Sequence, residues 1–471
     1  MSQKNETTVL VISLLLTVGI VGGIAWWFFG QAGRIKDDIF PPPSAPANQQ
    51  EIKARLSFGE KTLIPGEITP EKKAGIQALA QGNYQQAIAN LEASLKRNRN
   101  DPEALIYLNN ARIASSKSYT IFVSVPASTT PSIALEILRG VAQAQNEVNL
   151  GSKIQGVALK VGIADDENQP ETAKQIATSL VNNSEVLGVV GHYASDATLA
   201  AGDVYNSGQL VAISPTSTSV RISKLSPYVF RTVPSDFVAA RTLANYMTNN
   251  LKKQNVAVFF NSQSQYSLSL KNEFISSVGL EGGQVSNEFD LANPDFSAAR
   301  SLNQAMQQGA EVIMLAADAQ TLDKALQVVP VNQKKSILLG GDSLYNFKTL
   351  EVGREQAVGM VVTVPWHITS DRNASFPQKS GQLWGADVNW RTAMAYDATE
   401  ALIAALKLNP TRAGVQQALS SPGFSTPGAA GVVRFSSSGD RNAPVQLVRI
   451  VTGGRSGTGF DFEQISSSVL K

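Results

Sequence analysis

Predicted strands and helices alternate along the chain from residue 119 onward, and this alternation constrains the fold more than any other feature. Short runs rich in Val, Ile, Leu and Phe are separated by longer segments whose apolar residues recur at helical spacing. The predicted strands are 119–125, 157–164, 186–190, 210–213, 256–260, 311–315, 336–339 and 360–364. Strands joined by helices of this length form parallel sheets from βαβ units. Roughly 350 residues exceed one ordinary α/β sheet, so we predict two α/β lobes.

The composition limits the chemistry that such a fold could carry. The chain has no cysteine and only two histidines, His192 and His367, which excludes disulfides, thiolate catalysis, cysteine-bound zinc and three-histidine metal sites. Forty Lys and Arg balance thirty-eight Asp and Glu to a net charge of +2, too little to recruit nucleic acid. We therefore expect a protein that is not an enzyme and has no metal, cofactor or nucleic-acid partner.

The amino-terminal region reads as a membrane anchor followed by a spacer. Residues 9–29 are almost wholly apolar, and as a helix they would span about 30 Å, the thickness of the hydrocarbon core. A cleaved signal peptide is the alternative, although its apolar region usually runs only about 7–15 residues after a positively charged start. We predict a short tail over 1–8, a transmembrane helix over 9–29 and a proline-rich linker over 30–66.

Residues 67–116 are predicted to form a small helical unit. Thr69-Pro70 and Asp101-Pro102 are typical of helix starts, and Gly82-Asn83 interrupts the helical pattern. With Gly75 and Ala87, these positions make the unit resemble about one and a half tetratricopeptide repeats, whereas roughly three are usually needed for independent stability. We expect the unit to pack on a neighbouring part of the chain. It could bind a protein partner or act as an adaptor or self-association element.

Polar residues follow several predicted strands at their carboxyl ends, where open α/β sheets bind ligands. In chain order these residues are Ser128, Tyr193, Ser195, Thr216, Thr218, Tyr266 and Asp342. Hydroxyl groups beside helix N-termini suit a carboxylate, and an acid can pair with an ammonium group. Hydroxyls at helix starts are also common caps, so each turn alone is weak evidence. The convergence of several turns on one sheet edge predicts a site for a small polar ligand.

The order of these segments resembles the type I periplasmic binding proteins of the leucine/isoleucine/valine class, which are the receptors of ABC importers. The resemblance covers most of the chain and rests on residues 125–128, 138–142, 165–170, 191–195, 213–215, 230–236, 340–342, 395–398, 431–435 and 438–441. It implies two lobes, joined by strands that cross between them, which close on a small ligand.

The resemblance also implies roles for individual residues. In amino-acid binders, the positions matching Ser195, Thr216 and Thr218 hold the ligand carboxylate and ammonium in the first lobe. Those matching Tyr266 and Asp342 lie in the second lobe, where the acid pairs with the ammonium. The turn at 128–132 departs from the family because it lacks the usual glycine-rich stretch.

Together these features predict a two-lobed ligand-binding domain over 117–455 and a tail over 456–471. We expect a membrane-anchored receptor in the periplasm or extracytoplasmic space that delivers an amino acid or related ligand to an ABC importer. The alternative is a regulatory or scaffolding envelope protein that engages a partner such as a peptidoglycan synthase. Outer-membrane activators of those enzymes resemble such an arrangement, but they are anchored through a lipidated cysteine, which this chain lacks.

Other motifs carry less weight. Gly341-Asp342-Ser343-Leu344 matches the nucleophile motif of one serine esterase family, but no histidine follows His367 to complete the catalytic set. We expect His192 and His367 to be structural or to lie at the pocket rim. Trp366 is predicted to be a packed aromatic residue, with cleft lining as the alternative.

Overall fold

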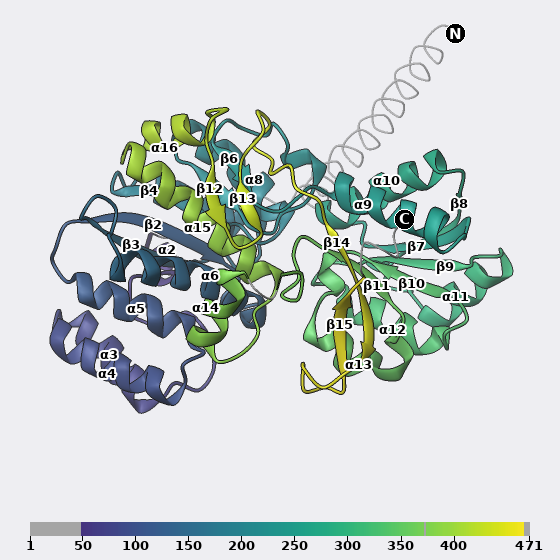
Figure 1. The fold of residues 1–471 in the computed structure, drawn as a ribbon, viewed down its shortest axis with the longest axis horizontal. Helices are drawn as coiled ribbons and strands as arrows, with labels where there is room; N and C mark the ends of the chain where they lie inside the picture. The colour runs from purple at the N-terminus through teal and green to yellow at the C-terminus, as the bar shows by residue number, and fades with distance from the viewer. Residues whose placement is uncertain (1–48, 372–373, 466–471) are drawn as a thin grey trace, which may run out of the picture. The chain divides into compact units, whose positions relative to one another are not determined.

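The structure, a computed structural model, describes residues 49–371 and 374–465. The predicted tail at 1–8, the transmembrane helix at 9–29 and most of the linker lie outside the described residues. Within the two described ranges, no helix combines the length and the apolar character needed to cross a bilayer. From Ile52 onward, the described residues form one compact unit. As the alternation of strands and helices predicts, this unit contains two α/β lobes, each built around its own sheet (Figure 1).

The first lobe is built on a six-stranded sheet with five parallel strands and one antiparallel edge strand. In spatial order the strands are β1 (Leu56–Ser57), β3 (Ala158–Asp165), β2 (Ser118–Val125), β4 (Val186–Val190), β5 (Ala212–Ser214) and β6 (Val229–Arg231). One face is covered by α6 (Pro131–Leu150) and α15 (Trp390–Leu408), the other by α7 (Pro170–Val181) and α8 (Ser195–Ser207). The last six side chains of β2 are buried, as expected for a central strand covered on both faces.

The second lobe is built on a seven-stranded sheet. Its order is β15 (Phe460–Gln464), β14 (Gln446–Thr452), β11 (Val361–Val364), β10 (Ile337–Gly340), β9 (Val312–Ala316), β7 (Asn255–Phe260) and β8 (Gln284–Asp290). The strands from β11 to β8 are parallel, whereas β14 pairs antiparallel with both of its neighbours, β11 and β15. On one face lie α9 (Asp236–Asn245) and α10 (Gln265–Leu280), and on the other α11 (Ala298–Gln307), α12 (Leu322–Asn332) and α13 (Phe347–Ala357).

Three strands of this sheet were not among those predicted: the interior strand β14 and the edge strands β15 and β8. Strand β15 falls within 456–471, the segment predicted to be a tail, and it pairs with β14 along its whole length. Its two aromatic residues, Phe460 and Phe462, alternate onto one face and pack against the core. Strand β8 was not predicted at all, because its partly exposed, largely polar sequence has no apolar run. Edge strands with few buried side chains carry little hydrophobic pattern.

The chain crosses between the lobes three times, between β6 and α9, between β11 and α14 (Ser375–Trp384), and between β13 (Gly431–Val433) and β14. After the second crossing, α14, α15, α16 (Arg412–Leu419) and the hairpin of β12 (Thr426–Gly428) with β13 complete the first lobe. Helices α6 and α15 approach so closely there that a Cβ at Gly140 would overlap the carbonyl oxygen of Thr392. Only glycine therefore fits at this crossing.

The predicted helical unit consists of α3 (Pro70–Ala80), α4 (Tyr84–Arg97) and α5 (Pro102–Ile113). Thr69 and Asp101 cap two of these helices, since their side chains accept hydrogen bonds from Lys72 N and Ala104 N. The expectation that the unit packs on a neighbour is confirmed, because α5 lies directly against α6 and β3 of the first lobe (Figure 1). Its membership of the tetratricopeptide class stays a prediction.

Two asparagine side chains and a short strand complete the edge of β3 that does not pair with β2. The Asn110 side chain of α5 accepts from Val161 N (3.2 Å) and donates to Val161 O (2.7 Å), as a neighbouring strand would. Asn149 of α6 does the same for Leu159, at 2.8 and 2.9 Å. Strand β1, which lies within the predicted linker, pairs with the far end of β3. The residues before 118 therefore satisfy backbone groups of the first sheet.

Candidate functional site

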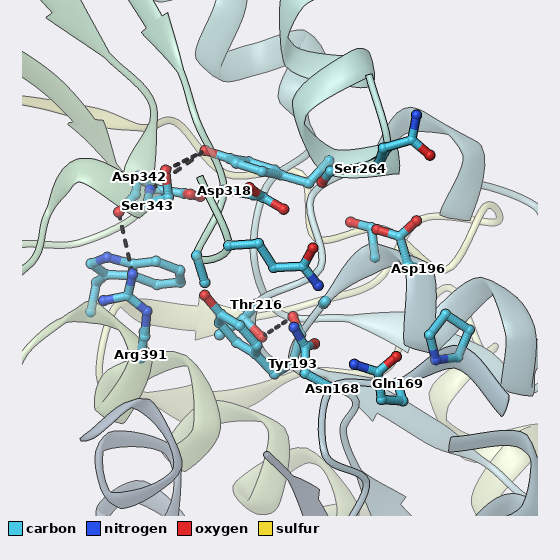
Figure 2. A pocket seen from close by; sticks show the side chains of 18 residues that line it. Asn168, Gln169, Tyr193, Asp196, Thr216, Ser264, Asp318, Asp342, Ser343 and Arg391 are labelled. Carbon is cyan, nitrogen blue, oxygen red and sulfur yellow. Dashed lines mark hydrogen bonds between the residues drawn. The ribbon is translucent and has the colours of Figure 1, made fainter. Parts of the chain in front are cut away.

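A cavity of about 240 Å³ lies between the two lobes, at the carboxyl ends of their strands. From the first lobe it is lined by the turn after β3, the start of α8, the turn after β5 and the start of α15. From the second lobe it is lined by the start of α10 and by the turns after β9 and β10 (Figure 2). Helix N-termini and strand ends therefore meet there from both sides, an arrangement that favours anionic and polar groups.

Five of the seven residues predicted from the sequence line this cavity: Tyr193, Ser195, Thr216, Tyr266 and Asp342. They come from four separate turns, so the structure brings together positions that lie as many as 149 residues apart, from Tyr193 to Asp342.

The other two predicted residues do not line the cavity. Ser128 is exposed, and its backbone N–H bonds to Asp165 Oδ1 at 3.3 Å, which holds its turn against β3. Thr218 is buried at 2% exposure, and its carbonyl accepts from Asp236 N at 2.8 Å. Both follow a strand in sequence, but the course of the turn directs them elsewhere.

The first-lobe hydroxyl groups form bonds between the turns that follow β4 and β5. Thr216 Oγ1 donates to Tyr193 O at 2.8 Å, and Ser195 Oγ accepts from Ser219 N at 3.2 Å. Burial raises the pKa of Tyr193 to about 12, so its phenol stays neutral at physiological pH. These bonds fix the turns after β4 and β5 against each other and position the N-terminus of α8 at the cavity.

On the second-lobe side, Asp342 is the central charged residue. Desolvation raises the pKa of its carboxyl group to about 6, against the opposing effects of Arg391 and a hydrogen bond from Tyr266. Tyr266 Oη lies 3.5 Å from Ser343 N. The Ser343 hydroxyl donates to the carbonyl oxygen of Ala317. Asp342 thus offers a carboxylate that a cationic ligand group would keep ionised.

Trp390 and Arg391 at the start of α15 line the cavity but were not predicted from the sequence. Both are only 2% exposed, and the guanidinium lies over the indole ring at 4.4 Å from its centroid. Arg391 Nη1 pairs with Glu136 Oε2 at 3.2 Å and Nη2 donates to Asp342 O at 3.4 Å, a contact between the lobes. In the sequence they look like two ordinary residues at a helix start capped by Asn389, so no pattern signals their role.

A second contact between the lobes lies at the cavity mouth. Both carboxylate oxygens of Asp196, in the first turn of α8, accept from the backbone N–H of Gln265, the first residue of α10, at 3.2 and 3.1 Å. Close by, Val220 N donates to Ser269 Oγ at 3.0 Å. A carboxylate at a helix N-terminus is favourable because the helix dipole and the free N–H groups attract it. These contacts hold the lobes together over the cavity.

The remaining candidates lie away from the cavity. His192 is fully buried and bonds to Asp166 Oδ2 (2.7 Å) and Tyr205 Oη (2.9 Å), which is a structural role. His367 bonds to Thr369 Oγ1, and burial lowers its pKa to about 4. Trp366 is buried and contacts the ring of Phe376.

Two α/β lobes, three connections between them and a polar cavity at the facing strand ends define the class of two-lobed binding proteins. The chain belongs to the periplasmic binding protein family, whose sequence model matches residues 123–455.

The chain is similar to several known proteins. A Leu/Ile/Val-binding protein homolog 3 from Brucella melitensis is 25% identical over 344 residues, which are 70% of this chain and 91% of that protein. An amino acid binding protein from Pseudomonas aeruginosa is 33% identical over 121 residues, 26% of this chain and 32% of its own length. The fold matches an ABC transporter substrate-binding protein from Desulfitobacterium hafniense, solved with Leu, at a TM-score of 0.62 and 24% identity, over 74% of this chain and 100% of that one.

Proposed function

We propose that this protein is a solute-binding receptor that closes its two lobes on a small polar ligand, an amino acid or a related compound, for an ABC-type importer. The observation that carries the proposal is the cavity of about 240 Å³ with a carboxylate on one lobe and hydroxyl groups with a helix N-terminus on the other. This volume lies below the roughly 300–1,000 Å³ of pockets for drug-sized ligands, so it suits a smaller molecule.

In this proposal the two ends of a zwitterion meet opposite lobes. The Ser195 hydroxyl and the N-terminus of α8 hold the carboxylate, because free N–H groups and the helix dipole attract negative charge. Thr216 fixes the neighbouring turn through its bond to Tyr193 O. Asp342 holds the ammonium group, with Tyr266 beside it. The ligand then adds contacts to both lobes, and this differential binding favours the closed arrangement. The names of the amino-acid-binding relatives support the ligand class.

The location follows from the same reasoning. We propose that residues 9–29 anchor the protein in the membrane and that the two lobes lie on the extracytoplasmic side, where receptors of importers meet their ligands. A regulatory role through a protein partner on α3–α5 is the second proposal. The structure supports it less, because α5 is almost wholly buried between α4 and the first lobe, which leaves only α3 and α4 to offer surface.

The proposal is tested with the full-length chain, purified in detergent, by thermal unfolding against a panel of amino acids followed by titration calorimetry. A ligand at one hundred times its dissociation constant should add about 2.7 kcal/mol to the free energy of unfolding. If no amino acid raises the unfolding temperature, the receptor proposal fails.

Two variants then locate the site. Asp342→Asn should weaken the ligand by roughly 2–5 kcal/mol, because the ammonium group would lose its charged partner. Ser128→Ala is the matched control, since this exposed residue follows a strand of the first lobe without lining the cavity. Equal losses in the two variants would contradict the site.

A further inference from the structure

The charged side chains that line the cavity between the lobes are mainly acidic. Three carboxylates line it, Asp196 from the first lobe and Asp318 and Asp342 from the second, against the single cation Arg391. The Arg391 guanidinium pairs with Glu136 Oε2 at 3.2 Å, so its charge is largely balanced. Within the described part of the chain, none of the three carboxylates forms an ion pair with a basic side chain. The protein therefore leaves an excess of negative charge at its own ligand cavity.

Asp318 is the carboxylate that has no role in the proposed site so far. It follows β9, and Asp342 follows β10, the parallel neighbour of β9, so the two acids lie on adjacent turns of the second lobe (Figure 2). Its Oδ1 accepts from Thr321 N at 3.0 Å, from Thr321 Oγ1 at 2.7 Å and from Asn261 Nδ2 at 3.0 Å. Its other oxygen, Oδ2, has no hydrogen-bond partner among the described residues and is not a buried atom. The carboxylate is therefore fixed through one oxygen, and the other oxygen is accessible to a ligand.

The carboxylates of the two lobes act on each other across the cavity. Burial raises the pKa of Asp196, bonds from backbone N–H groups oppose this shift, and the negative charge of Asp318 on the other lobe adds to it. The bonds of Asp196 to Gln265 N hold its charge at the cavity in spite of this repulsion. A cationic group between the lobes would offset the repulsion, whereas a neutral group would not. The charge of the lining therefore favours a cationic group on the ligand in the closed arrangement.

The rest of the lining is also polar. Among the described residues that line the cavity there is no Leu, Ile, Val, Met or Phe, and four amide side chains contribute, Asn168, Gln169, Gln263 and Gln320. Ammonium and guanidinium groups have only donors, and carboxylates, amide oxygens and hydroxyls all accept from them. A branched aliphatic side chain would leave these acceptors unpaired, and polar sites reject an analogue that lacks the matching polar group by large factors.

We infer that the ligand carries a second cationic group, on its side chain, and that Asp318 binds this group together with Asp196 of the facing lobe. Asp342 keeps the α-ammonium group, and the Ser195 hydroxyl with the N-terminus of α8 keeps the carboxylate. The inference rests on the proposed function and makes it more specific. It assigns the receptor to basic amino acids, in contrast to the leucine, isoleucine and valine in the name of the Brucella relative.

The test uses two pairs of amino acids that are close in shape and differ in charge: arginine with citrulline, and lysine with norleucine. With the full-length chain in titration calorimetry at pH 7.5, the cationic member of at least one pair should bind at least about tenfold more tightly than its neutral partner. A smaller or reversed preference in both pairs, or tighter binding of any neutral or acidic amino acid, would overturn the inference while the receptor function stands. If no amino acid binds at all, the proposed function fails and the inference fails with it.

A pair of variants tests the carboxylate itself. Asp318→Asn removes the charge and keeps an oxygen for the bonds from Thr321, so it should weaken the cationic ligand at least about tenfold and its neutral partner by less than about threefold. Asp290→Asn is the matched control, because Asp290 ends β8 outside the cavity and its Oδ1 likewise accepts from two backbone N–H groups, those of Ser262 and Ala292. It should leave both affinities within about twofold. Unchanged affinity for the cationic ligand in Asp318→Asn, with an unfolding temperature like that of the parent chain, would overturn the inference. The ligand comparison needs no variant and decides the question even if Asp318→Asn does not fold.

Discussion

Replacing Asn110 by alanine should destabilise the first lobe far more than the same change at its neighbour. Asn110 is 4% exposed, and its side chain reaches from α5 to both backbone groups of Val161 in β3. It also donates to Phe58 O at 2.9 Å and accepts from Gln145 Nε2 at 2.9 Å. Asn110→Ala removes all four bonds at once.

The size of the effect follows from the groups left behind. Gln145 Nε2 keeps a second acceptor, Leu159 O, and so loses little. The N–H and C=O of Val161 lie at a fully buried residue and would lose a partner, at about 1–3 kcal/mol each. The expected loss is therefore about 2–6 kcal/mol in the free energy of unfolding.

Asn109 is the control because it is adjacent, of the same type and equally buried. Its side chain donates only to Leu105 O, within α5. Asn109→Ala leaves a similar cavity but leaves no backbone group of the sheet without a partner. It should therefore lower the free energy of unfolding by only about 1 kcal/mol. Urea unfolding followed by circular dichroism gives both values. Similar losses in the two variants would refute the idea that α5 completes the sheet edge.

Three further predictions concern the cavity. The carboxyl group of Asp342 has a pKa of about 6, and its ionised form binds the ammonium group of the ligand. Affinity for an amino acid should therefore be constant above about pH 7 and fall about tenfold per pH unit below pH 6. Equal affinity at pH 5 and pH 7.5 in titration calorimetry would contradict this pairing. Asp196→Ala should separate the lobes in the ligand-free protein, because it removes the carboxylate at the N-terminus of α10. The chain has no cysteine, so two introduced cysteines, one per lobe, can carry spin labels. An unchanged distance between the two labels would argue against this contact. Gly341→Ala would place a methyl group against the Tyr266 hydroxyl and should weaken the ligand about tenfold, whereas Gly454→Ala, where no atom lies within 4 Å, should have no effect in the same titration.

The predicted strands lie where the hydrophobic pattern is strong, whereas β14, whose sequence is also largely apolar, was not predicted. The central strands β2, β4, β9 and β11 are buried on both faces, so each contains an apolar run. The edge strand β8 is partly exposed throughout and has no such run. Strand β1 has two residues and forms only because β3 offers it an edge. Pairing of this kind depends on a partner that is distant in sequence.

The site was predictable in part for a similar reason. Tyr193, Ser195, Thr216, Tyr266 and Asp342 follow strands whose carboxyl ends share a sheet edge, so the order of strands and helices places them near the cavity. Arg391 follows no strand. It reaches the cavity because α15 returns to the first lobe after the second crossing and packs on α6.

By itself, the sequence determined the class of the fold, the two lobes and most of the turns that meet between them. Local periodicity and strand-end position carry that information, because they depend on residues close together in the chain. Only the tertiary structure decided that the helical unit completes the first sheet, that Ser128 and Thr218 lie outside the cavity, and that Trp390 and Arg391 line it. Those outcomes depend on contacts between residues far apart in the sequence, such as Asn110 with Val161 and Arg391 with Glu136, which no local pattern records.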